Sequence, residues 1–193
     1  MSEQLLFREF RDSGEASTLF FALLLRASDQ QTLAAFANEH RRSEGLTGTP
    51  TPGHRFHLSL HAIGNYTRLP DRVARACGVA AASVHASAFA VAFDRTMTFA
   101  TGHDTKPFVL CASDGMMALE SLHNQLGQAL WRVGLGKHVE RRFTPHITLL
   151  YDERCAPERL VSPLIFRFDS FVLIHSLVHP SKHVHVARWP LRS

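Results

Sequence analysis

The sequence predicts an α+β fold with two antiparallel-rich sheets, flanking helices and a central cleft. Apolar segments with strand patterning alternate with segments of helical periodicity, which favours sheets covered by helices. The tetrapeptide His57-Leu-Ser-Leu also recurs as His146-Ile-Thr-Leu, each time on a predicted strand that follows a predicted helix. This repeated order indicates two similar lobes whose motif strands lie side by side in the middle.

The elements of the first half follow from apolar runs and their interruptions. Residues 18–26 (TLFFALLLR) form a buried strand, and apolar residues at helical spacing predict a helix over 29–42. A Gly- and Pro-rich loop over 45–53 leads into a strand at 55–63 that carries the first motif. An Ala-rich helix over 69–82 closes this half.

The second half is predicted to repeat this alternation. We expect a hairpin of strands 84–93 and 97–100 turning at Asp94-Arg95, a strand at 107–112 and a helix from Ser113 or Asp114 to about Val133. A basic loop at 134–140 leads to the second motif strand at 143–151. Pro157 and Pro163 then interrupt the chain before the closing strands at 166–179 and 183–191.

The length of 193 residues fits one domain, so we assign residues 1–17 to an arm and 18–193 to a single bilobal unit. A net charge of +4 is compatible with an anionic ligand and equally with a solvated basic surface. Three cysteines without CxxC spacing indicate neither a disulfide framework nor a zinc knuckle. With no membrane-length apolar run or secretory leader recognised, we expect a cytoplasmic monomer without an obligate protein partner.

Both motifs place an imidazole and a hydroxyl on one face of a strand, because residues i and i+2 point the same way. His57 with Ser59 and His146 with Thr148 would then meet across a cleft. Two imidazoles can transfer protons, and two hydroxyls can donate hydrogen bonds to phosphoryl oxygens. The pattern predicts acid–base chemistry on a phosphodiester without a metal.

Other residues near the motifs are weaker candidates. Arg142 could face a phosphate or a ribose, or be a solvated charge at a strand end. Phe56 and Phe143 could stack on a base, although a Phe beside such a strand more often belongs to the core. His61 shares the face of His57 by simple alternation, which places it at the cleft rim.

The thirteen histidines also allow a metal interpretation. His57 and His61 have the i, i+4 spacing of a helical zinc pair, but their segment is predicted to be a strand and no carboxylate accompanies them. We therefore expect neither a metal nor another cofactor. His183 and His185 alternate along the last strand and are interpreted as surface residues.

The two motifs resemble the paired HxT/Sx motifs of the 2H phosphoesterase superfamily, and most closely its 2′-5′ RNA ligase / RNA 2′,3′-cyclic phosphodiesterase branch. Arg142-Phe-Thr-Pro-His-Ile-Thr-Leu149 is similar to the context of the second motif, and the segment from His57 to Gly64 resembles that of the first. The resemblance covers about residues 18–190. Tyr151 stands where an Arg is common, and we expect it to line the cleft.

The resemblance implies a bilobal fold of this family and hydrolysis of a 2′,3′-cyclic phosphate to a 2′-phosphate. The substrate would be an RNA end or a small cyclic nucleotide. We assign His57 as the acid and His146 as the base, roles that exchange if the ester binds the other way round. The reverse reaction, attack by a 5′-hydroxyl, would be 2′-5′ ligation. Two alternatives stay open: an RNA-end binding module with little turnover, and a phosphodiesterase for a small non-RNA cyclic phosphate.

Overall fold

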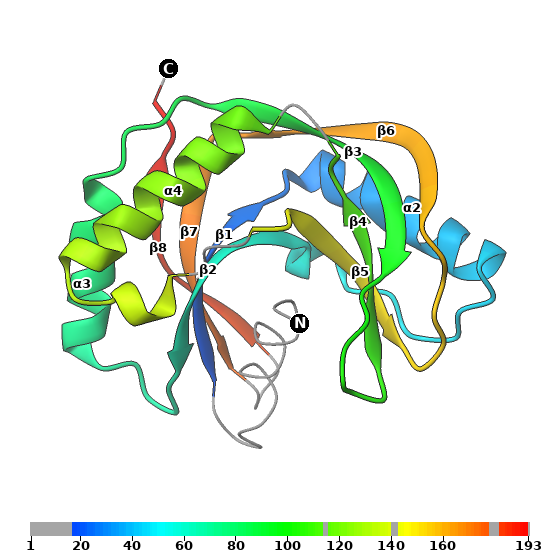
Figure 1. The fold of residues 1–193 in the computed structure, drawn as a ribbon, viewed down its shortest axis with the longest axis horizontal. Coiled ribbons are helices and arrows are strands. Elements are labelled where there is room, and N and C mark those ends of the chain that lie inside the picture. Colours follow the sequence, from blue (N-terminus) through cyan, green and yellow to red (C-terminus); the bar gives the residue numbers. More distant parts are fainter. Residues whose placement is uncertain (1–16, 114–115, 140–142, 178–181, 193) are drawn as a thin grey trace.

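One antiparallel sheet of eight strands, with three α-helices, makes up the part of the chain that the structure describes (Figure 1). This computed structural model describes residues 17–113, 116–139, 143–177 and 182–192. The strand order is β6-β3-β4-β5-β2-β1-β7-β8. The strands are β1 (Thr18–Leu24), β2 (His57–Asn65), β3 (Phe89–Thr98), β4 (Lys106–Cys111), β5 (His146–Asp152), β6 (Arg159–Phe168), β7 (Ser170–Leu177) and β8 (Lys182–Pro190); the helices are α2 (Ala27–Ser43), α3 (Asp71–Ala82) and α4 (Met117–Arg132).

The predicted α+β class with an antiparallel sheet and flanking helices is confirmed, with one difference. The two expected sheets are joined through β2 and β5, which pair at a single position, Leu58 with Ile147. Each half is extensively paired within itself, with β1 bonded to β2 and β7 and with β4 bonded to β3 and β5. The fold is therefore two four-stranded halves joined at the motif strands.

Different clusters of apolar side chains lie on the two faces of the sheet. On β1, Leu19, Phe21 and Leu23 belong to the main core together with residues of all three helices. The alternate residues Phe20 and Ala22 form a small cluster with Val172 and Ile174 of β7 on the opposite face. A matching small cluster in the other half consists of Phe99, Val109 and Cys111. These two clusters mark the face that none of the three described α-helices covers. Figure 1 shows α3 and α4 together beside β7 and β8.

Two strand predictions are wrong. Asp94-Arg95 is not a hairpin turn, because both residues lie within β3. The only irregularity there is a shift in the register of β3 against β6 between Phe93 and Arg95. The segment 166–179 is not one strand: β6 ends at Phe168 and β7 begins at Ser170. The start of β6 was not predicted, because Pro163 was interpreted as an interruption of the chain. Since β6 is an edge strand, the missing N–H group of Pro163 is tolerated. Residues 1–16, which make up nearly all of the predicted arm, and Asp114 lie outside the described residues.

A β-bulge follows the hydroxyl residue of each motif. In β2 the register against β1 skips Leu60, and in β5 the register against β4 skips Leu149. Both skipped leucines are buried in the main core. Beyond each bulge the alternation of faces is inverted, because the extra residue shifts the side-chain period by one. This inversion decides where His61 and Tyr151 point.

The loop before the first motif is tied to the end of the second motif strand. The buried carboxylate of Asp152 accepts hydrogen bonds from the backbone N–H groups of Thr47, Gly48 and Arg154. The N–H of Thr51 donates to the carbonyl of Leu149 over 2.7 Å. The approach to β2 is thus fixed against β5, so the two motifs are positioned together.

Three aromatic rings stack between β2, α4 and the segment that enters β5. The His61 and His123 ring centroids lie 4.0 Å apart, and those of His123 and Phe143 lie 4.1 Å apart at 13°. His61 Nε2 donates to the backbone carbonyl of His123 over 2.9 Å. Burial is the main cause that lowers the pKa of both imidazoles, that of His123 to about 3. Both are therefore neutral in the folded protein near pH 7.

None of the helices in the described part of the chain is long and apolar enough to cross a bilayer. All three cysteines are free, Cys77 and Cys111 being buried and Cys155 exposed.

The histidine stack predicts acid sensitivity of the fold. Unfolded His123 titrates near pH 6.5 and folded His123 near 3, so the unfolded chain binds more protons between these values. The free energy of unfolding should fall as the pH drops through this window, by up to about 1.4 kcal/mol per pH unit for each such group. His123→Phe keeps a ring in the stack and should flatten the fall, measured by urea denaturation. The exposed His85→Phe is the control; parallel curves for wild type and His123→Phe would contradict the prediction.

Candidate functional site

The two motif histidines lie on adjacent central strands and on the face that no α-helix covers. Leu58 and Ile147 point into the main core, so their neighbours point the other way. The antiparallel pairing of Leu58 with Ile147 sets His57 beside Thr148 and Ser59 beside His146. The two imidazoles occupy diagonal positions, which in such ladders are about 7–8 Å apart.

Each imidazole is held in the same tautomer by its own strand. His57 Nδ1 lies 2.7 Å from the carbonyl oxygen of Arg55, and His146 Nδ1 lies 2.8 Å from that of Thr144. A carbonyl oxygen only accepts, so each Nδ1 carries the proton and donates it. The neutral ring then has its lone pair on Nε2. The two rings thus present the same nitrogen, Nε2, and are oriented by equivalent hydrogen bonds.

An aromatic ring of the same face also supports each imidazole. Phe20 lies against His57 with centroids 5.0 Å apart, and Phe99 lies against His146 with centroids 4.9 Å apart. These rings belong to the two small apolar clusters of the halves. The hydrogen bond and the ring contact together restrict the side-chain rotation of both histidines, which is what a preorganised site needs.

His57 is uncharged near neutral pH in this site. Burial lowers its pKa to about 4, and the positive charges of His146 and Arg55 act in the same direction, against the opposing effect of the hydrogen bond to the Arg55 carbonyl. The contribution of His146 agrees with the diagonal positions of the two rings on adjacent strands. Both hydroxyl residues, Ser59 and Thr148, are half-buried on the same face.

Sequence reasoning missed two residues beside His57. His183 was interpreted as a surface residue, but its ring lies 5.5 Å from that of His57 and 5.9 Å from that of Phe20, centroid to centroid. Arg55 Nη2 lies 3.4 Å from His183 Nε2. Only the pairing of β8 beside β7 and β1 brings His183 here, and no local pattern in the sequence signals that proximity.

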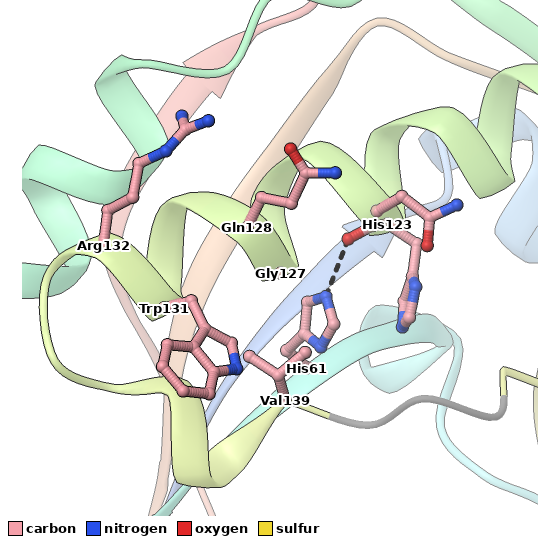
Figure 2. Close-up of a pocket in the computed structure, with 8 residues that line it drawn as sticks. His61, His123, Gly127, Gln128, Trp131, Arg132 and Val139 are labelled. Atoms are coloured by element: carbon pink, nitrogen blue, oxygen red, sulfur yellow. Dashed lines mark hydrogen bonds between the residues drawn. The ribbon is translucent and has the colours of Figure 1, made fainter.

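Two of the predicted cleft residues lie elsewhere. Phe56 is 1% exposed and belongs to the main core, so it presents no face to a base. His61 is 1% exposed and faces α4, because the bulge at Leu60 inverts the alternation that placed it beside His57. Figure 2 shows His61 beneath α4 in a small pocket that it shares with Trp131 and Val139, on the helix-covered side of the sheet.

The remaining candidate residues differ in where they lie. Phe143 is half-buried and stacks on His123, which places it on the helix-covered side. Tyr151 is 40% exposed and pairs with Pro107 beyond the bulge at Leu149, on the face of His146 and Thr148. Arg142 lies outside the described residues. Within the described ranges, no group of three or more His, Cys, Asp or Glu side chains is arranged to hold a metal ion.

Several solved structures share this fold. E. coli LigT in its apo form superposes with a TM-score of 0.71 at 22% identity, covering 93% of this chain and 100% of LigT. TT0787 of Thermus thermophilus gives 0.72 at 20% identity, covering 91% and 98%. Kluyveromyces marxianus Usb1 is more distant, with 0.51 at 13% identity, covering 93% and 98%. These identities support a common fold and not a common substrate.

No curated protein sequence matches the chain. A family model does match: that of the 2′-5′ RNA ligase superfamily aligns with residues 29–179, most of the chain and both motifs. The match supports a phosphoesterase or RNA-ligase type of activity and agrees with the fold and the paired histidines. The chain belongs to the 2′-5′ RNA ligase superfamily.

Proposed function

We propose that this protein hydrolyses 2′,3′-cyclic phosphates, at RNA ends or in small cyclic nucleotides, to 2′-phosphates by acid–base catalysis with His57 and His146. The observation that carries the proposal is the equivalent pair of Nδ1–carbonyl hydrogen bonds, which direct the proton-transfer function of both rings to Nε2. E. coli LigT has been crystallised with phosphate and with 3′-AMP, which supports a phosphoryl ligand in a site of this fold. The three free cysteines support a reducing, cytoplasmic setting.

The chemistry needs one proton removed and one delivered. Water attacks phosphorus and forms a new P–O bond while one Nε2 takes its proton. The bond from phosphorus to the 3′ oxygen breaks, and the other imidazole, as imidazolium, protonates that oxygen through its Nε2. Ser59 and Thr148, beside the opposite histidine in each case, would donate hydrogen bonds to the non-bridging oxygens. No metal is needed in this scheme.

The electrostatics favour exchanging the roles that the sequence suggested. His57 has a pKa lowered to about 4, so it is neutral at pH 7 before substrate binds and suits the base. A general acid must carry a proton, which favours His146 for protonation of the leaving oxygen. We therefore propose His57 as the base and His146 as the acid, instead of the reverse.

One further reaction is open to the same two histidines. Attack by a 5′-hydroxyl in place of water would give 2′-5′ ligation with the same two histidines. The alternatives of an RNA-end binding module and of a phosphodiesterase for a small non-RNA cyclic phosphate remain as rival proposals. Two tautomerically fixed histidines argue against a pure binder, since binding alone does not require two oriented proton-transfer groups.

The two-histidine scheme predicts that loss of either imidazole removes turnover. A short RNA with a 2′,3′-cyclic phosphate end should be converted to a 2′-phosphate by wild type in EDTA, as followed by ³¹P NMR. His57→Ala and His146→Ala should each lose about 10²–10⁴-fold in rate. His85→Ala, an exposed histidine on another part of the surface, should be unaffected. Wild-type binding without any turnover of this RNA or of small cyclic nucleotides would refute the proposal in favour of a binder or another cyclic phosphate.

The role assignment predicts opposite pH profiles for a single variant. In His146→Ala, His57 is the only motif histidine left. The pH dependence of the residual kcat/KM therefore reports the ionisation of His57. If His57 is the base, this rate is lost as the pH falls through the pKa of His57, because the protonated ring cannot accept a proton; burial still lowers that pKa in this variant, although the charge of His146 no longer does. A residual rate that instead declines as the pH rises above this value would assign His57 as the acid. Parallel ¹H NMR titration of the ring protons would confirm which group titrates.

A further inference from the structure

We propose that His183 is a positioning residue for His57: its ring covers one flank of His57 and keeps that imidazole out of water in a single orientation. The inference rests on the proposed function, in which His57 transfers a proton. The role is one of packing and not of contact with the substrate, so it can also be measured without turnover.

Three rings of the helix-free face pack against one another. The ring centroid of His183 lies 5.5 Å from that of His57 at an interplanar angle of 73°, and 5.9 Å from that of Phe20 at 79°. Phe20 in turn lies 5.0 Å from His57. Each ring therefore contacts the other two, and His57 cannot rotate about its side-chain bonds without displacing a neighbour. The cluster supplies the support that a preorganised proton-transfer group needs.

Arg55 joins the two imidazoles from the short 3-10 turn η1 (Gly53–Arg55) that precedes β2. Its carbonyl accepts the hydrogen bond from Nδ1 of His57 over 2.7 Å, and its Nη2 donates to Nε2 of His183 over 3.4 Å. One residue thus holds both histidines, by its backbone on one side and its side chain on the other. Loss of His183 would remove a contact of the same residue that orients His57.

Packing alone does not explain an imidazole at position 183. Because Nε2 of His183 accepts from Arg55, the neutral ring carries its proton on Nδ1. That Nδ1 is buried and has no hydrogen-bond partner among the described residues. A buried N–H group without a partner costs free energy that an apolar ring would avoid. What the imidazole supplies in return is a ring against His57 together with an acceptor for Arg55.

His183 covers His57 without adding a charge. Burial is the main cause that lowers the pKa of His183 to about 3, and four neighbouring basic groups act in the same direction: His57, Arg55, His185 and His54. His57 is faced by His146 from β5 and by Arg55 from η1, and both add to the lowering of its pKa by burial. Near pH 7 His183 is therefore neutral, and its effect on His57 is the exclusion of water.

The test measures the ionisation of His57 by NMR titration of its ring protons, assigned from the spectrum of His57→Ala. His183→Ala opens the flank to water and should raise the pKa of His57 from about 4 toward 6.5, because burial is the main cause of the lowering. His183→Phe restores an uncharged ring and should keep the pKa low. The control is His185→Ala, which removes an exposed histidine two residues further along β8 and should leave the pKa unchanged.

Under the proposed function the same variants change the pH profile. Relative to wild type, kcat/KM of His183→Ala for the cyclic phosphate should fall by up to about thirtyfold at pH 5, where a ring of pKa 6.5 is mostly protonated and one of pKa 4 is mostly neutral. At pH 8, where both rings are neutral, the difference should be small. His183→Phe should follow wild type at both pH values, whereas a merely structural role would lower the rate equally at both.

The titration separates this inference from the proposed reaction. A pKa of His57 that rises in His183→Ala and stays low in His183→Phe supports the inference even if wild type hydrolyses no cyclic phosphate, in which case only the proposed function falls. If His183→Ala does not fold, His183→Gln removes the ring but keeps an oxygen acceptor for Arg55, and the same rise is expected. An unchanged pKa of His57 after removal of the ring, or an equal rise in His183→Phe, overturns the inference.

Discussion

The pairing of Leu58 with Ile147 is the constraint on which the rest of the site depends. It is the one ladder position through which β2 and β5 join the two halves of the sheet. Both side chains are fully buried in the main core, so the two strands cannot rotate independently. A slip of one residue in either strand would turn the histidine of that strand into the core and its buried residue, Leu58 or Ile147, outward. Burial of two apolar residues therefore fixes the face and the register of four polar ones.

The bulges after Ser59 and Thr148 show how each half uses a short stretch of strand for two purposes. Before the bulge, the polar residues of the motif face the helix-free side. At the bulge, Leu60 and Leu149 enter the core, and the inverted alternation that follows puts His61 under α4 and Tyr151 on the site face. The same backbone device in both halves thus produces different environments, because the residue that follows differs.

These details mark the limit of what the sequence could predict. The alternation of strand-patterned and helix-patterned segments was sufficient to predict the α+β class. The repeated motif was sufficient to place both His-apolar-hydroxyl-apolar segments on central strands, because this pattern puts the His and the hydroxyl on one face of a regular strand. His61 was misplaced because simple alternation cannot foresee an inserted residue. The start of β6 was missed because Pro163 reads as an interruption unless the strand is known to lie at the edge of the sheet. Arg55 and His183 are 128 positions apart, and only the tertiary pairing of β8 brings them together.

The residues on the β4 side of the two histidines differ in chemistry from those on the β8 side. We call these two sets of residues the walls of the site, and their difference makes the site asymmetric. On the β4 side, Phe99, Val109 and Cys111 form an apolar cluster against His146. On the β8 side, Phe20 is apolar but is followed by His183 and Arg55, in a half whose strands lack acidic residues. A nucleotide has the same asymmetry, with an apolar base and a charged backbone. The two imidazoles are held alike through Nδ1, so under the proposed function the unequal walls would orient the ester, while the burial of His57 favours that ring as the base.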